Sequence, residues 1–237
     1  MLDLSREELI QKVDRFVDDL LDAAGIQEPP VDAIDLAQRH LGMVVCLDRK
    51  QPQRGRAQRS AKGRLIYLRP EPTEERHQWT VAHEIGEHLK PSLLKHLGAE
   101  PGQTPPMAGE SLANLLAYHL LVPHHWFADD APHLEYNLLE LKKRYRTASH
   151  EVIVWRFLDL PSPSIVTIID NEHIYRRRSN AWPAHRHLEP AEKECQRYVH
   201  YYSRPKVVQK NQWTVQGWPV HQPDWKREIL RSVVSEE

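Results

Sequence analysis

The sequence has little cysteine and no long apolar run, and each shortage excludes a class of protein. Only two cysteines occur in 237 residues, Cys46 and Cys195, so we expect neither a disulfide framework nor a cysteine-based zinc site. The longest nearly apolar run, residues 112–122, is interrupted by Asn114 and His119. It is shorter than the roughly 20 residues that a membrane-spanning helix needs. The N-terminal residues are amphipathic and acidic, unlike a signal peptide. We therefore expect a cytoplasmic protein with no membrane partner.

The chain also has no excess of charge of either sign. It contains 32 Lys and Arg against 33 Asp and Glu, for a net charge of -1. A protein whose main role is to bind phosphate backbones would be strongly basic, so the composition argues against that role. Histidine, in contrast, is abundant, with 15 residues. Because histidine is the commonest metal ligand and an acid–base group near neutral pH, these residues are the first candidates for a site.

Hydrophobic periodicity and turn residues predict an α+β protein in two parts. We expect helices over residues 5–23, 31–40, 73–89, 110–121, 138–144, 149–158, 191–202 and 225–234. We expect strands over residues 43–47, 64–68, 165–169 and 173–177, an extended segment over 207–218, an exposed loop over 49–62 and an irregular connection over 91–108. Prolines at 161 and 163 predict a domain boundary. The first domain would comprise residues 1–160, with a helix-turn-helix-like segment at 137–159. The second would be a small α+β domain of unknown role at 161–237.

The helix predicted over residues 73–89 carries a pattern of metal-binding and acid–base residues. Successive helical residues are about 100° apart, so residues four apart face nearly the same way. His83 and Glu87 can therefore point at one metal ion, while Glu84 can reach a metal-bound water without ligating the metal. Two ligands one turn apart with a glutamate beside the first is the arrangement of H-E-x-x-H zinc peptidases.

The sequence departs from H-E-x-x-H at its last position. Position 87 is glutamate and the histidine follows one residue later, at His88. On a regular helix His88 points roughly 140° away from His83. Three outcomes are open: Glu87 is the second ligand, a π-bulge at Gly86 turns His88 towards the site, or the helix binds no metal. We favour Glu87, because it requires no distortion of the helix.

We expect the third ligand from the next helix, residues 110–121. Glu110 lies at its start, and the small residues Ala113 and Ala117 allow this helix to approach the first one closely. That placement suits a carboxylate ligand that faces His83. The alternative is that Glu110 is only a first-turn acid, stabilised by the helix dipole.

Together these segments resemble the ImmA/IrrE family of zinc-dependent metallo-endopeptidases. One shared motif is R-x-x-T-x-A-H-E, which here carries one extra residue between Arg76 and Thr80 and ends at Glu84. The other is E-x-x-A-N-x-x-A-x-x-L-L-x-P, which residues 110–123 follow closely. The resemblance extends over about residues 5–160, and the order and spacing of the motifs make it specific.

The resemblance implies a zincin-like helical peptidase core with a small sheet, which holds Zn²⁺ or another divalent metal. It implies that His83 and Glu110 are metal ligands and that Glu84 is the general base, with Glu87 in place of the family's second ligand histidine. A second carboxylate would make the metal a weaker Lewis acid. The implied activity is hydrolysis of a peptide bond, by metal-activated water, in a protein or peptide substrate. Family members act on transcriptional repressors in stress responses, so a repressor is a candidate substrate.

Two other functions stay open beside the peptidase. The first is a regulatory protein-binding module, that is, a peptidase fold with weak or no activity. The glutamate at position 87 and the extra C-terminal domain are consistent with this function. The segment 138–158 could contact DNA, but we favour a helical packing unit because the chain is not basic. His124 and His125, which follow Pro123, could stabilise an oxyanion or bind substrate, the alternative being a solvated pair.

Overall fold

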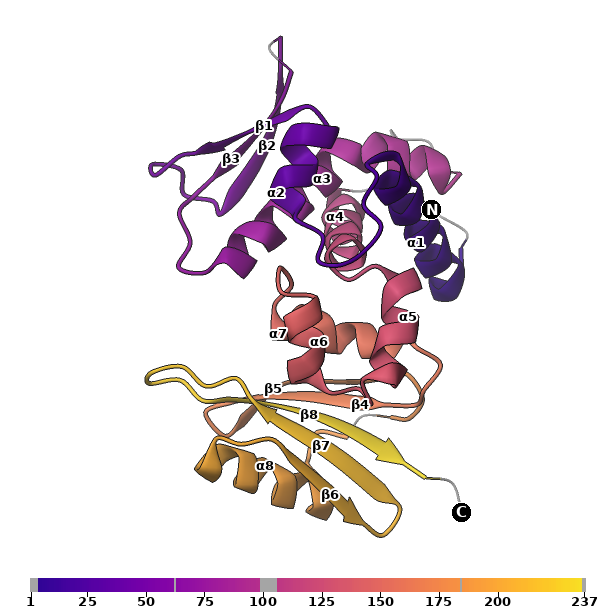
Figure 1. The fold of residues 1–237 in the computed structure, drawn as a ribbon, viewed down its shortest axis with the longest axis vertical. Helices are drawn as coiled ribbons and strands as arrows, with labels where there is room; N and C mark the ends of the chain where they lie inside the picture. Colours follow the sequence, from indigo (N-terminus) through magenta and orange to yellow (C-terminus); the bar gives the residue numbers. More distant parts are fainter. Residues whose placement is uncertain (1–3, 62, 99–105, 184, 236–237) are drawn as a thin grey trace. The chain divides into compact units, whose positions relative to one another are not determined.

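The computed structural model describes residues 4–61, 63–98, 106–183 and 185–235, without the side chains of residues 106–110 (Figure 1). The chain divides into two compact units, each of which has its own sheet. The first comprises Met1–His133 and Lys142–Ser149, and the second comprises Leu134–Leu141 and His150–Glu237. The domain boundary expected at Pro161–Pro163 stays a prediction.

The first unit contains a three-stranded sheet. Its strands are β1 (Met43–Leu47), β2 (Gly55–Ser60) and β3 (Gly63–Leu68), in the order β1-β3-β2. β1 runs parallel to β3 and β2 runs antiparallel to it, so β2 is an edge strand. The exposed loop predicted over residues 49–62 is therefore wrong for residues 55–60. This strand is mostly exposed and polar, so it has no apolar alternation, and pairing with β3 rather than its own sequence makes it extended.

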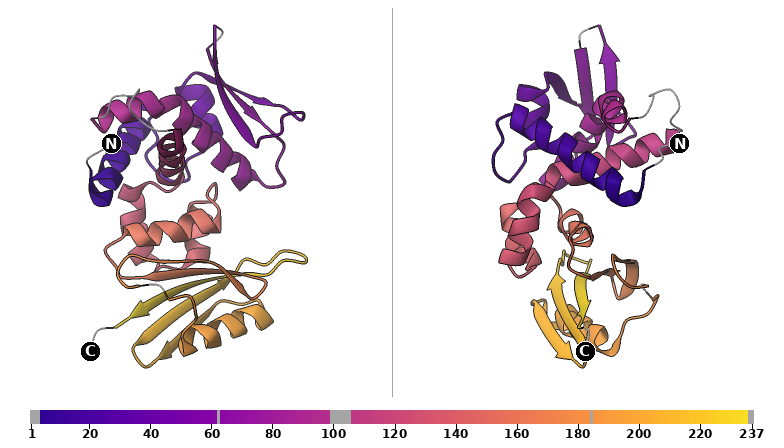
Figure 2. Two further views of the ribbon diagram at one scale, coloured as in Figure 1. Left: turned by 180° about the vertical axis from the view of Figure 1, so that it is seen from behind. Right: turned by 90° about the vertical axis from the view of Figure 1, so that its right-hand side faces the viewer.

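In the described part of the first unit, five α-helices and one π-helix surround the core. They are α1 (Arg6–Ala23), α2 (Ala33–Asp35), η1 (Leu36–His40), α3 (Glu74–His96), α4 (Pro106–Leu121) and α5 (His124–His133). The predicted first helix is confirmed, and Ser5 and Glu8 form a capping box at its start. Figure 2 shows α3 beside the β1-β3-β2 sheet, and α3 also packs along α4. The two long helices and the edge strand thus lie together.

Helix α3 is longer than its sequence predicts. We expected it to stop before Pro91, and it continues to His96 with Pro91 inside it. An internal proline costs about 3 kcal/mol. Leu93 and Leu94 beyond it are buried, and burying a leucine contributes about 1.5–3 kcal/mol each. Core packing therefore offsets the proline. The predicted irregular connection is wrong for residues 91–96 and for residues 106–108, which begin α4. Residues 99–105 of that connection lie outside the described residues.

The second unit is built on a five-stranded antiparallel sheet. Its order is β5-β4-β8-β7-β6, formed by β4 (Ile165–Asp170), β5 (His173–Ser179), β6 (Lys206–Lys210), β7 (Trp213–Pro219) and β8 (Arg227–Val234). The predicted hairpin of β4 and β5 is confirmed. The closing helix predicted over residues 225–234 is wrong, because β8 pairs with both β4 and β7 in the sheet. Ile229 and Leu230 point to opposite faces of the sheet and both are buried. The apolar and polar residues of β8 therefore do not alternate, and the sequence lacks the pattern by which a strand is predicted.

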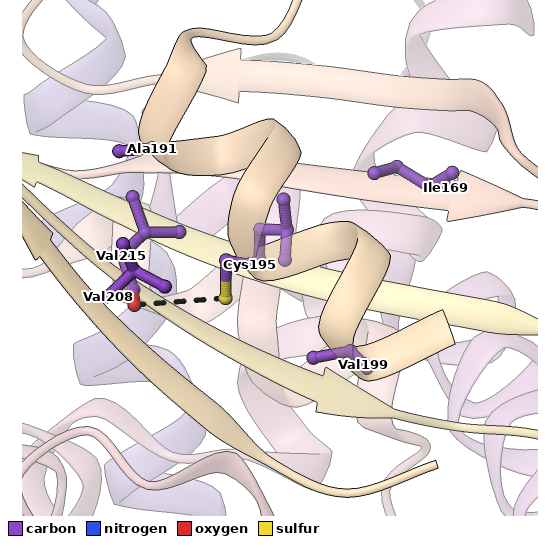
Figure 3. Close-up of a cluster of buried hydrophobic side chains, with 7 residues drawn as sticks. Ile169, Ala191, Cys195, Val199, Val208 and Val215 are labelled. Carbon is purple, nitrogen blue, oxygen red and sulfur yellow. Dashed lines mark hydrogen bonds between the residues drawn. The ribbon is translucent and has the colours of Figure 1, made fainter. Parts of the chain in front are cut away.

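The helix predicted over residues 191–202 is confirmed as α8 (Pro190–Tyr202), and it covers one face of this sheet. Figure 3 shows its inward residues over the strands, with the Cys195 thiol at their centre. The buried cluster consists of Ile169, Ala191, Cys195, Val199, Val208, Val215 and Leu230. A Cβ at Gly217 would lie 2.6 Å from Cys195 Sγ, so glycine in β7 allows the close approach of the helix.

Two short helices were predicted over residues 138–144 and 149–158, and both are present. They are α6 (Leu138–Arg144) and α7 (His150–Arg156), the second followed by the 3-10 turn η3 (Phe157–Asp159). Among the described residues, no helix is long and apolar enough to cross a membrane.

Candidate functional site

A pocket of about 470 Å³ in the first unit brings the predicted motif together. Its walls come from β2 and the residues before it, from α3 and from α4. The lining residues are Gln53, Arg54, Gly55, Arg56, Ala57, Trp79, Thr80, His83, Glu84, Glu87 and Asn114. His83 and Glu87 were predicted to point the same way, with Glu84 about 100° round the helix but within reach of the same site. All three line this pocket.

The alternative ligand His88 has a different position. Helix α3 is α-helical throughout the motif, with no π-turn at Gly86. The His88 side chain is buried, and its Nε2 donates a hydrogen bond to the carbonyl oxygen of Leu65 in β3 at 2.9 Å. Burial lowers the pKa of His88, while the hydrogen bond to Leu65 opposes that shift. The structure therefore uses His88 to join α3 to the sheet, and His88 does not line the pocket.

The imidazole of His83 is oriented by a residue on the neighbouring helix. Its Nδ1 donates a hydrogen bond to Asn114 Oδ1 of α4 at 3.1 Å. An amide oxygen only accepts hydrogen bonds, so in the neutral ring Nδ1 carries the proton and Nε2 keeps its lone pair. Metal-ligating histidines are usually held in this way, with one ring nitrogen donating to an oxygen and the other available as the ligand.

Two glycines allow the walls of the pocket to approach one another. A Cβ at Gly86 would lie 2.9 Å from Ala113 Cα, so α3 and α4 are in backbone contact beside the motif. A Cβ at Gly55 would lie 2.5 Å from Glu84 Oε1, so β2 passes directly over the Glu84 carboxylate. Glu84 is only 6% exposed although it is an ionisable residue. The sequence thus places a carboxylate in a narrow space between an edge strand and a helix.

Glu87 has a cationic neighbour one turn along the helix. Its Oε2 lies 3.2 Å from Lys90 Nζ, and both side chains are partly exposed at 27%. This ion pair is weak because solvent screens it. Glu87 can therefore exchange its lysine partner for a metal ion at small cost.

The third predicted ligand cannot be compared with these side chains. Glu110 belongs to α4, but its side chain lies outside the described residues. Within the part of the chain whose side chains are described, no group of three His, Cys, Asp or Glu residues could hold a metal ion. The donors present in the pocket, one imidazole with a fixed proton and a solvent-accessible carboxylate, are of the types that bind Zn²⁺ and harder divalent ions. They fit such a metal as part of a ligand set.

The comparisons with known proteins identify the family. Residues 38–156, about half of the chain, match the family model of the IrrE N-terminal-like domain, peptidase family M78. The chain therefore belongs to this family, as its motifs predicted. Membership implies a zincin-like core, and the family is zinc-dependent.

A solved structure extends the similarity to both units. The chain is similar to a protein described as a Mycobacterium tuberculosis transcriptional regulator, with a TM-score of 0.64 and 16% identity, over 96% of this chain and 80% of that chain. At this identity the similarity is one of fold. None of the curated proteins matches the chain.

Sequence reasoning missed the contribution of β2 to the pocket. Arg54, Gly55 and Arg56 line it, and the only signal in the sequence was a basic, turn-rich segment. The histidine pair after Pro123 does not line it. His125 pairs with Asp18 of α1 at 2.6 Å, and both His124 and His125 begin helix α5 instead of forming a loop.

Proposed function

We propose that this protein is a metal-dependent endopeptidase whose site is the pocket between β2, α3 and α4. One observation carries the proposal: His83, Glu84 and Glu87 share a pocket that is bordered by an edge strand. His83, Glu87 and Glu110 would hold the metal, Zn²⁺ or another divalent ion. When bound, the metal would supply a Lewis acid that polarises the substrate carbonyl and acidifies water.

Glu84 is the proposed general base. Its carboxylate is nearly buried against Gly55, which limits its hydration and fixes its position in the pocket. It takes a proton from the attacking water as the new C–O bond forms. It then delivers this proton to the amide nitrogen, whose bond to carbon breaks, so that the amine leaves neutral.

Strand β2 is the proposed binding surface for the scissile segment. An edge strand presents unpaired backbone donors and acceptors, and an extended peptide can add to it as a further strand. Gly55 puts the backbone of β2 in contact with Glu84, so a peptide added here would run past the general base. This arrangement supports an endopeptidase, because it leaves both ends of the bound segment open to continue.

A regulatory protein in the cytoplasm is the proposed substrate, with a transcriptional repressor as the candidate. The fold similarity to a protein described as a transcriptional regulator supports a regulatory setting. The helix-turn-helix-like segment at 137–159 is proposed as a packing unit and not as a DNA contact.

A second candidate function is a regulatory binding module with little or no activity. The Glu87–Lys90 ion pair favours it, since Glu87, which replaces the family's histidine, already has a cationic partner, although a weak one. In this alternative the pocket and edge strand bind a partner without cleaving it.

Metal analysis and turnover separate the two functions. The protein, purified without a histidine tag, is assayed for bound zinc and for cleavage of an unfolded fluorescent casein. A peptidase shows about one metal per chain, and Glu84→Gln keeps the metal but loses at least 100-fold in turnover. The binding module shows no metal and no turnover, and Glu87→His then gains zinc affinity from near zero. Absence of zinc together with a Glu84→Gln variant that behaves like the wild type would overturn the peptidase.

A further inference from the structure

We infer that the segment bound in this pocket is acidic, and that Arg54 and Arg56 on the β2 edge select it. The inference rests on the proposed function, since it concerns the substrate of the same site. It goes further by stating which side chains flank the bond that is cleaved.

The segment that contains β2 concentrates positive charge in a chain that is otherwise acidic. Residues 49–69 hold no Asp or Glu, while the whole chain has a net charge of -1. The basic residues of this segment are Arg49, Lys50, Arg54, Arg56, Arg59, Lys62, Arg64 and Arg69. A peptide approaching the edge strand therefore meets a field that attracts carboxylates.

Little of this charge is neutralised by nearby acids. Arg54 is 62% exposed at its side chain, and its Nε lies 3.6 Å from Glu71 Oε1. The same carboxylate also contacts Arg69 at 3.3 Å and Arg76 at 3.5 Å, so three guanidinium groups share one negative charge. The group retains a positive excess that a substrate carboxylate can satisfy.

Arg56 makes no ion pair among the described residues. Its guanidinium lies over the ring of Tyr67, the residue paired with it in β3, at 4.8 Å from the ring centroid. Stacking on an aromatic face orients the guanidinium while its N–H groups remain able to donate. Arg56 is exposed, so this is a preformed cationic group with capacity for a bidentate carboxylate contact.

The positions of the two arginines define the pattern that they can recognise. They flank Gly55, which touches Glu84, so both residues are sequence neighbours of the point where β2 meets the general base, and both line the pocket. Side chains of residues two apart lie on the same face of an extended chain. Arg54 directly precedes β2 and Arg56 lies in it, so an added strand that continues past Gly55 would meet them at residues two apart. The preferred substrate then carries two acidic residues separated by one residue.

A nucleic acid would also be attracted by this charge. The peptide is favoured because the arginines border the pocket that holds His83 and Glu84, and because β2 offers backbone hydrogen bonds that a phosphodiester chain cannot match. Tighter binding of a nucleic acid than of the acidic peptide would contradict the inference.

The test measures binding by the full chain carrying Glu84→Gln, so that turnover does not interfere. Three fluorescein-labelled ten-residue peptides share one leucine-rich centre and differ at two positions that are separated by one residue. These two positions are both Glu in the first peptide, both Gln in the second and both Lys in the third. We expect the Glu peptide to bind at least 10-fold tighter than the Gln peptide by fluorescence anisotropy. Arg54→Glu with Arg56→Glu should remove this preference, and Arg56→Gln alone should reduce it. Arg197→Glu, an exposed charge reversal on α8, should leave it unchanged.

Several outcomes would overturn the inference. Equal affinity for the Glu and Gln peptides, or no binding of either, contradicts acidic selection, as does tighter binding of a labelled 20-nucleotide DNA. Loss of the preference in Arg197→Glu would show an effect of net charge alone. Cleavage assays with the wild type separate the two proposals: binding preference without cleavage supports acidic selection and overturns the peptidase. Cleavage of the Glu and Gln peptides at equal rates supports the peptidase and overturns acidic selection.

Discussion

His83 and Asn114 are joined by a hydrogen bond of 3.1 Å that runs from the imidazole of α3 to the amide of α4. The bond fixes the tautomer of the one imidazole in the pocket and connects the two helices that supply the proposed ligands. It therefore makes the orientation of His83 depend on a residue 31 positions away in the sequence.

Removing this acceptor should weaken metal binding. We expect Asn114→Ala to lower zinc affinity about 10- to 100-fold, the usual effect of losing an outer-shell partner of a ligand histidine. Asn114→Asp keeps an oxygen acceptor and should retain most of the affinity. Competition with a zinc-sensitive dye measures both variants, and equal affinities for wild type and Asn114→Ala would contradict the role assigned to Asn114.

The contact between Gly86 and Ala113 predicts that Gly86→Ala destabilises the protein, although helix propensity alone would predict stabilisation. Alanine is a better helix former than glycine by about 1 kcal/mol. At Gly86, however, a new Cβ would meet the Ala113 backbone at 2.9 Å and 3.0 Å, and overpacking of this kind costs about 1–3 kcal/mol. We expect Gly86→Ala to lower the free energy of unfolding in urea titrations. Ser92→Ala, at an exposed position of the same helix, is the control and should be neutral or slightly stabilising.

Two histidine–aspartate pairs attach α1 to α4 and α5. Because one pair is buried and the other is exposed, we expect them to contribute differently to the free energy of unfolding. Asp14 and His119 are buried and their side-chain atoms lie 2.5 Å apart, whereas Asp18 and His125 are more than one third exposed. Asp14→Ala should cost about 1–3 kcal/mol, because buried His119 loses this acceptor. Asp18→Ala should cost less than about 1 kcal/mol. Thermal unfolding of both variants at the same pH gives the comparison, and equal losses would contradict it.

The two cysteines should differ in reactivity. Burial raises the pKa of Cys195 to about 12, while Cys46 is partly exposed. Because only the thiolate is nucleophilic, Cys195 should stay unmodified by iodoacetamide at pH 8 in the folded protein. Mass spectrometry should find one label on the native chain, at Cys46, and two after unfolding in guanidinium chloride. Labelling of Cys195 at a rate similar to Cys46 would show that the α8 face of the sheet opens.

Much of the first unit could be predicted because local patterns and tertiary structure agree there. The capping box of α1, strand β1 and the helix carrying His83 follow from periodicity and capping residues. The shared direction of His83 and Glu87, with Glu84 one step round the helix, follows from helical geometry alone. The family followed from the spacing of the motifs. The metal ligand set, with Glu110, stays a prediction.

The errors occur where tertiary contacts override local preference. Strand β2 has no apolar alternation and is extended because β3 pairs with it, and β8 is buried on both faces so that its pattern resembles a helix. Pro91 predicts the end of a helix, but α3 continues past it because the buried leucines of the following turn stabilise the helix.

The sequence by itself determined the family of this protein and its candidate chemistry, one histidine and two glutamates at helical spacing. Only the tertiary structure decided what surrounds that chemistry. It placed Asn114 against His83, directed His88 to the backbone of β3, and laid a basic edge strand over Glu84. Helical spacing is a local property of the chain, whereas these contacts join segments far apart in the sequence, so packing alone selects them.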